Sequence, residues 1–221
     1  MRNVLLSWSS GKDSAWALRL LLREKDIRVA ALLTTFNRTH DRVAMHAVRR
    51  SLVEAQAESI GLPLWTAEIP WPCSNEQYEQ IMAGVCERAG DEGINAIAFG
   101  DLFLEEIRDY RINQLSGTSL EPLFPVWELP TAKLARDMIA GGIKAKITCI
   151  DPSKLDRAFA GREFDLAFLD DLPDDIDPCG ENGEFHTFIY DAPMFSRPID
   201  VRLGDIIERD GFVFADLLRN D

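Results

Sequence analysis

The sequence predicts an α/β fold in which a doubly wound parallel sheet is followed by a smaller C-terminal α+β domain. Three observations support this prediction. Short apolar runs alternate with helical segments, a Ser/Gly-rich loop follows the first run, and prolines punctuate the chain after Gly117. Alternating strands and helices are typical of parallel sheets with helices on both faces. The expected division is residues 1–117 for the first domain and 118–221 for the second.

The first region contains four strand–helix repeats. Its expected strands are short apolar runs, and its expected helices carry apolar residues at spacings of three and four. The strands are expected at 4–7, 29–35, 64–69 and 94–99, and the helices at 14–23, 43–60, 75–88 and 102–115. Right-handed crossovers favour the doubly wound topology, in which ligands bind at the carboxyl ends of the strands.

The second region mixes shorter elements. Its expected helices are 131–140 and 164–172, and its expected strands are 143–150 and 185–190. Prolines interrupt the segment before the first of these helices, and Gly141 with Gly142 ends it. This pattern predicts a compact α+β unit.

The composition is that of a globular protein, with 46% hydrophobic and 28% charged residues. A formal net charge of -13 disfavours general binding to nucleic acids, because it repels a phosphate backbone. The four cysteines form no C-x-x-C pair, and no apolar stretch approaches the length of a membrane span. These features predict a cytoplasmic enzyme with reduced thiols that does not bind membranes, and a homodimer is possible.

A phosphate-binding loop is expected directly after the first strand. A Walker loop is excluded, because Leu6 occupies its glycine position and Asp13 follows Lys12. Small residues, hydroxyl groups and the start of a helix nevertheless make a cradle for an anion. Asp13 beside phosphate is best explained by a bound Mg²⁺, although an ordinary helix N-cap is the simpler alternative. The expected ATP-binding residues here are Ser7, Ser9, Ser10, Gly11, Lys12, Asp13 and Ser14.

Gly100 and Asp101 follow the fourth expected strand, so they are expected at the same edge of the sheet and are also predicted to bind ATP. On the helix after them, Arg108 and Arg111 lie on one face and could reach phosphate or a substrate carboxylate. A surface ion-pair network with the neighbouring Glu105 and Glu106 is an equally plausible role for these arginines.

Residues 9–14, Ser-Ser-Gly-Lys-Asp-Ser, resemble the S-G-G-x-D-S signature of the PP-loop ATP pyrophosphatases, with Ser10 in place of the first glycine. Further segments resemble the diphthine–ammonia ligase family over nearly the whole chain. They are Met45–Val48, Gln56–Pro63, Gly100-Asp101 with Arg108, and Cys179–Thr187. The resemblance implies that a carboxylate is adenylated by ATP, that pyrophosphate leaves, and that ammonia then displaces AMP.

The resemblance also implies roles for individual residues. It favours Asp13, Glu181, Glu184 and His186 as catalytic residues, and His46, Arg108 and Asn182 as substrate-binding residues, with ATP and Mg²⁺ as cofactors. In the last motif Asn182 replaces a glycine and His186 replaces an acid of the family pattern E-G-G-E-F/Y-E-T. This variant form resembles bacterial relatives, for which a corrinoid-related substrate is the alternative.

Other readings remain open at this point. The acidic turn around Glu181 could simply be solvated, and His46 could be structural. A thiolation enzyme acting on tRNA would need a cysteine pair and a basic face, which the sequence lacks. A non-catalytic module that binds ATP or AMP is the third possibility. No glutaminase region is present in the sequence, so the expected ligase would use free ammonia or ammonia from a partner.

Overall fold

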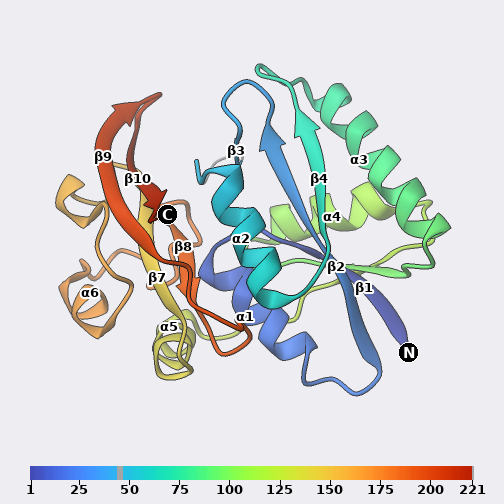
Figure 1. Cartoon of the computed structure of the whole chain (residues 1–221), viewed down its shortest axis with the longest axis horizontal. Helices are drawn as coiled ribbons and strands as arrows, with labels where there is room; N and C mark the ends of the chain where they lie inside the picture. The colour runs from blue at the N-terminus through green and yellow to red at the C-terminus, as the bar shows by residue number, and fades with distance from the viewer. Residues whose placement is uncertain (44–46, 221) are drawn as a thin grey trace.

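A computed structural model of the chain describes residues 1–43 and 47–220. Its first sheet has five parallel strands in the order β4-β2-β1-β5-β6, and a short strand, β3, pairs antiparallel with the end of β2 (Figure 1). The strands are β1 (Arg2–Ser7), β2 (Ile27–Asn37), β3 (Arg42–Val43), β4 (Leu64–Ile69), β5 (Ala96–Ala98) and β6 (Glu121–Leu123). The first sheet therefore continues as far as Leu123.

Helices cover both faces of this sheet. They are α1 (Lys12–Leu21), α2 (Arg50–Ile60), α3 (Asn75–Asp91) and α4 (Glu105–Leu115). Successive side chains of a strand point to opposite faces, and in β1 Leu6 packs in one core with Leu18 of α1, while Leu5 packs in another with Met82 of α3. The predicted doubly wound sheet is confirmed.

The second region is an antiparallel sheet with strand order β8-β7-β10-β9 and short helices around it (Figure 1). Its strands are β7 (Lys144–Ile150), β8 (Phe185–Asp191), β9 (Val201–Arg209) and β10 (Phe212–Arg219). Its helices are α5 (Thr131–Ala140), the single 3-10 turn η1 (Arg157–Phe159) and α6 (Leu166–Asp171). The predicted C-terminal α+β unit is thus confirmed, and helix α5 has the predicted bounds.

Two local predictions differ from the structure. The helix expected at 43–60 begins only at Arg50, because Val43 pairs with Phe36 of β2 and its N–H donates to the Val48 carbonyl. The hairpin of β9 and β10 was not predicted. Its turn, Asp210-Gly211, has φ angles of 53° and 83°, which fit the two-residue turns that Asp-Gly sequences favour.

The two sheets meet at the loop that follows β1. In that contact Ile189 of β8 donates its N–H to the Ser10 carbonyl at 3.0 Å. Gln56 of α2 is fully buried and donates its Nε2 to the carbonyls of Ser10 at 3.1 Å and Ile189 at 2.7 Å. Its Oε1 accepts a hydrogen bond from Trp8 Nε1 at 2.8 Å. One glutamine therefore holds the first loop, the second sheet and α2 together.

Two further findings concern the chain as a whole. All four cysteines are free. In residues 1–43 and 47–220, no helix combines the length and the apolar character that crossing a bilayer requires.

The junction predicts the effect of replacing Gln56. Gln56→Leu roughly keeps the volume of the side chain, but the buried Trp8 N–H and two buried carbonyls each lose a hydrogen-bond partner. We therefore expect the free energy of unfolding to fall by about 2–4 kcal/mol. Urea denaturation measures this change. The matched control is Gln80→Leu on the exposed face of α3, which should change stability by less than about 0.5 kcal/mol. Equal effects of the two variants would contradict the proposed role of the buried amide.

Candidate active site

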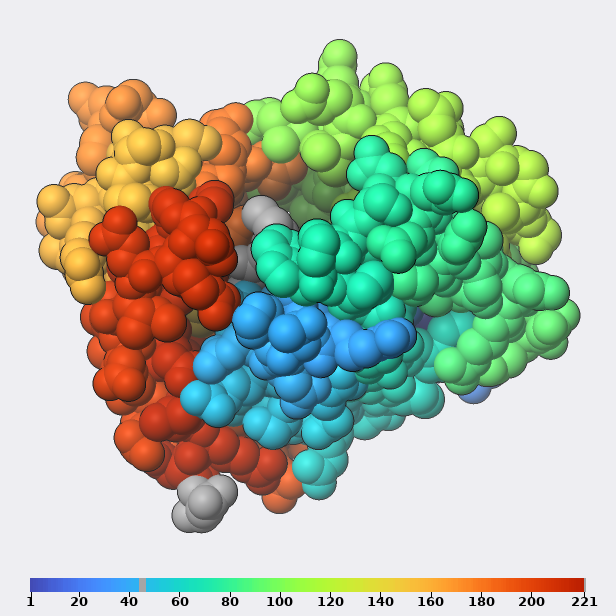
Figure 2. Space-filling model, turned by 90° about the horizontal axis from the view of Figure 1, so that it is seen from above, coloured from blue at the N-terminus to red at the C-terminus, as the bar shows by residue number. Residues whose placement is uncertain are grey.

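A cleft opens at the carboxyl edge of the first sheet, where β1 has β2 on one side and β5 on the other. It has two adjoining chambers of about 220 Å³ and about 470 Å³. The loop after β1, the Gly100-Asp101 turn after β5, and residues 179–181 and 185–187 line it. Seen from above, the surface is hollowed between the C-terminal residues and the first domain (Figure 2). Reversal of strand order at this point makes it the expected ligand site of a doubly wound sheet.

A larger hollow of about 770 Å³ lies between α3 and α4. Met82, Cys86, Tyr110 and Gln114 are among its walls, and neither the loop after β1 nor the segment 179–187 reaches it. The candidate site residues therefore line the cleft at the edge of the first sheet and not this hollow.

The loop after β1 is shaped for an anion. Ser10 has a φ of 69°, a left-handed conformation that favours glycine, and it occupies the position where the PP-loop signature has glycine. A Cβ on Gly11 would lie 3.1 Å from the Thr187 carbonyl oxygen, so the close contact with β8 favours glycine. Gly11 is also the N-cap of α1 and has no side chain to cap it, which leaves the start of the helix open to a ligand. Ser14 Oγ is 3.1 Å from Ser9 Oγ and donates to the Gly11 carbonyl at 3.0 Å.

Gly100 lets the chain after β5 pack closely against this loop. A Cβ at Gly100 would lie 3.0 Å from the Ser14 backbone nitrogen and 3.1 Å from the Asp13 carbonyl carbon. A side chain there would push the turn after β5 away from α1. Gly100 thus sets the distance between Asp101 and the loop.

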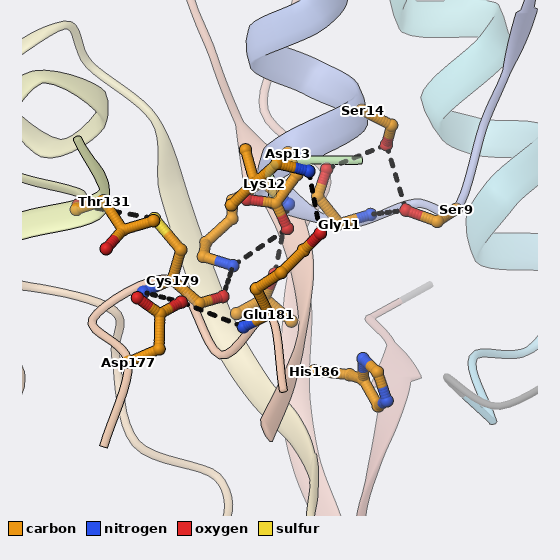
Figure 3. Close-up of polar contacts among 12 residues, drawn as sticks. Ser9, Gly11, Lys12, Asp13, Ser14, Thr131, Asp177, Cys179, Glu181 and His186 are labelled. Atoms are coloured by element: carbon orange, nitrogen blue, oxygen red, sulfur yellow. Dashed lines mark hydrogen bonds and ion pairs between the residues drawn. The ribbon is translucent and has the colours of Figure 1, made fainter. Parts of the chain in front are cut away.

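Lys12 is buried and points into the second domain. Its Nζ donates to Asp13 Oδ2 at 2.9 Å and to the Cys179 carbonyl, and it lies 5.2 Å from the centre of the Phe185 ring (Figure 3). Burial alone would lower the pKa of Lys12, but the Asp13 carboxylate and other nearby groups raise it overall, so the side chain stays charged. Its ammonium group ties α1 to the segment that carries Glu181.

Three carboxyl groups face the cleft near the loop. Asp13 Oδ1 and Asp101 Oδ2 are buried and have no hydrogen-bond partner among the described residues. Glu181 Oε1 accepts the Leu102 N–H at 2.7 Å. Burial raises the pKa of Asp13 and Asp101, opposed by Lys12 and Arg111 respectively. Burial also raises the pKa of Glu181 to about 7, with the Leu102 N–H opposing the rise and Asp13 adding to it.

These carboxyl groups fit a Mg²⁺ ion that is shared with phosphate. Within the described part of the chain, no three His, Cys, Asp or Glu side chains form a ready-made metal site. Mg²⁺ is commonly held by one or two carboxylates together with substrate phosphates, so a complete protein cage is not needed. The unpartnered oxygens of Asp13 and Asp101 are suitable ligands for that arrangement.

His186 lines both chambers of the cleft. Its ring lies apart from the Lys12–Asp13 pair (Figure 3). Burial, with the Lys12 charge acting in the same direction, lowers the pKa of His186 to about 4. The imidazole is therefore neutral at neutral pH and is a weaker base than an ordinary histidine.

Glu184 and Asn182 organise the loop instead of facing the cleft. Glu184 is 2% exposed, and its Oε1 accepts hydrogen bonds from the Asp177 N–H at 3.2 Å and from Asn182 Nδ2 at 3.0 Å. The described walls of the cleft include Glu181 and His186 but neither Glu184 nor Asn182.

The two arginines of α4 have different positions. Arg108 stacks on Trp127 with 4.6 Å between the guanidinium carbon and the ring centre, and it does not line the cleft. Arg111 lines both chambers and approaches Asp101 to 3.7 Å. His46, which was predicted to bind substrate, lies outside the described residues.

Thr187 and Gln56 are site residues that sequence reasoning did not identify. Thr187 Oγ1 accepts the Lys12 N–H at 3.1 Å, so β8 holds the start of α1 directly. The available signal for Gln56 was its place at the start of the Gln56–Pro63 segment that resembles the family. For Thr187 there was no signal beyond its place in the last motif.

The pKa of Glu181 predicts how stability depends on pH. A carboxyl pKa that folding raises from 4.5 to about 7 costs stability above pH 7, and this cost disappears as the pH falls toward 4.5. After allowance for solvent screening, Glu181→Gln should stabilise the protein by about 1–2 kcal/mol near pH 9 and have little effect near pH 4.5. Thermal or urea unfolding at the two pH values tests this. The surface variant Glu87→Gln is the control, and a stabilisation by Glu181→Gln that does not depend on pH would contradict the prediction.

Comparison with known proteins gives the family. Residues 1–118 match the diphthamide synthase N-terminal domain, and residues 130–215 match the diphthamide synthase C-terminal domain. Diphthine–ammonia ligases of Mus musculus and Homo sapiens are each 25% identical to the chain, over 94% of its length and 85% of theirs. The diphthine–ammonia ligase of Schizosaccharomyces pombe is 22% identical over 90% of this chain and 36% of its own. On the strength of these two domain matches, the chain belongs to the diphthamide synthase family.

Proposed function

We propose that this protein is an ATP-dependent ligase that adenylates a carboxylate, releases pyrophosphate and then transfers ammonia to form an amide. The observation that carries the proposal is that one cleft is lined by both the anion-binding loop and the segment with Glu181 and His186. Membership of a family whose relatives are named diphthine–ammonia ligases supports the choice of a carboxylate and ammonia as substrates.

In the first half-reaction an oxygen of the acceptor carboxylate attacks the α-phosphorus of ATP, and the bond to the β-phosphate oxygen breaks. The hydroxyl groups of Ser9 and Ser14 and the open start of α1 bind the phosphates. Asp13 and Asp101 would hold a Mg²⁺ ion, which would supply positive charge to offset the negative charge of the pyrophosphate.

In the second half-reaction ammonia attacks the acyl carbon, AMP leaves, and one proton must be removed from the nitrogen. His186 is neutral and lines the cleft, so it accepts this proton. Glu181, held by the Leu102 N–H, orients the ammonia. The products of the complete reaction are an amide, AMP, pyrophosphate and a proton.

Other residues act by holding these groups in place. Lys12 joins Asp13 to the Cys179 carbonyl, and Glu184 fixes the turn that presents Glu181 through Asp177 and Asn182. We therefore assign Glu184 and Asn182 to the support of the loop. Arg108 stacks on Trp127 and is not among the described walls of the cleft, so we assign it no part in this work.

A thiolation reaction fits the cleft poorly. Cys179 is the one cysteine among its described walls, and burial raises the pKa of its thiol, which weakens it as a nucleophile. Its sulfur also lies 3.5 Å from the Thr131 carbonyl oxygen, inside the protein.

The proposal predicts the products of turnover. With ATP, Mg²⁺, ammonium and a metabolite or protein extract as the source of acceptor, the protein should form AMP and pyrophosphate together with an amidated product. Asp13→Asn can still accept from Lys12 but loses the metal ligand, so AMP formation should fall about a hundredfold or more. Asp91→Asn at the exposed end of α3 is the control. Primary formation of ADP and phosphate, or near-normal turnover by Asp13→Asn, would refute the proposal.

A further inference from the structure

We infer that Arg111 is the residue that binds the α-phosphate, the phosphate that remains with the nucleoside after pyrophosphate leaves. This inference rests on the proposed ATP chemistry and goes beyond it by assigning one phosphate to one side chain. Three separate observations lead to it: the supply of positive charge in the cleft, the unsatisfied groups around Arg111, and its place between the chambers.

The cleft offers little positive charge. Among the described residues that line it, the only lysine or arginine side chains are Lys12 and Arg111. Lys12 already donates hydrogen bonds to Asp13 and to the Cys179 carbonyl, and its Nζ lies 5.2 Å from the centre of the Phe185 ring. Three carboxyl groups line the same space. A nucleotide phosphate that enters the cleft therefore has Arg111 as its one accessible cationic partner in the described structure.

The Arg111 side chain is held in place, but one of its hydrogen-bond donors is unused. Its Nε is buried and has no hydrogen-bond partner among the described residues, and neither has Asp101 Oδ2. These two atoms form an ion pair at 3.7 Å, which is too long for a hydrogen bond. The guanidinium carbon lies 5.0 Å from the centre of the Phe99 ring, which limits where the group can move. A buried donor of this kind is costly to leave unpaired, and a phosphate oxygen would satisfy it.

The position of Arg111 selects the α-phosphate. The smaller chamber contains Lys12, Asp13 and Ser14 and suits the terminal phosphates, whereas the larger one is walled by apolar side chains such as Leu33 and Ile69 and suits the nucleoside. Arg111 lines both chambers. The α-phosphate is the chemical link between a nucleoside and its terminal phosphates, so it lies where the two chambers meet.

Calorimetric titration of the full chain with AMP, adenosine and pyrophosphate, each in the presence of Mg²⁺, tests this assignment. Arg111→Gln should weaken AMP binding by about tenfold to a hundredfold while adenosine and pyrophosphate binding change by less than about twofold. Arg111→Lys keeps the charge but loses the planar fork, so its AMP affinity should fall between those of the wild type and Arg111→Gln. Arg108→Gln, one helical turn away and outside the cleft, is the matched control and should bind all three ligands normally.

Three outcomes would overturn the inference. They are unchanged AMP affinity in Arg111→Gln, an equal loss of AMP and adenosine, which indicates a packing role, and a loss of pyrophosphate binding alone, which places Arg111 on the leaving group. The titrations measure binding and not turnover, so their result does not depend on the ligase reaction. A wild-type protein that makes no amide refutes the proposed function, whereas the ratio of AMP to adenosine affinity still decides the role of Arg111.

Discussion

The hydrogen bonds received by the Ser10 carbonyl are the constraint on which the cleft depends. Ile189 of β8 and Gln56 of α2 both donate to this one oxygen, and they hold a serine in the left-handed conformation that the loop requires. The loop after β1 therefore gets its shape from the second sheet as well as from the first. Thr187 and Glu181 of the second region belong to the walls of the same cleft, so both regions contribute to it.

Three buried carboxyl groups dominate the electrostatics of the cleft. The chain has a net charge of -13, and Asp13, Asp101 and Glu181 face one another with raised pKa values. Burial is the largest cause for each group, and charge repulsion from neighbouring carboxylates adds to it, so a divalent cation that arrives with ATP would stabilise the ionised forms of all three. In the proposed reaction these groups would favour metal-bound nucleotide over free nucleotide, since phosphate alone would add further negative charge.

Periodicity in the sequence was sufficient for the sheet and for most helices, because their apolar faces are determined locally. It failed where a distant partner decides the structure. Val43 lies in β3 and pairs with β2 instead of starting a helix. The β9–β10 hairpin was not predicted, although Asp210-Gly211 is a strong turn signal. The site shows the same limit. Arg108 and Arg111 lie one turn apart on α4, and the sequence does not show which of them faces the cleft. In the structure Arg111 lines the cleft, and Arg108 stacks on Trp127.

The two departures from the family motif at residues 181–187, Asn182 and His186, have different positions in the structure. Asn182 uses its side-chain amide to bond Glu184 inside the turn, so an asparagine in place of glycine changes the support of the loop and not the surface that a substrate meets. His186 replaces an acid and lines both chambers, where burial keeps it neutral. Exchanging a carboxylate for a neutral imidazole removes one negative charge and places a ring with one donor and one acceptor nitrogen in the cleft. A difference in acceptor between this protein and its relatives would therefore be determined by His186 and not by Asn182.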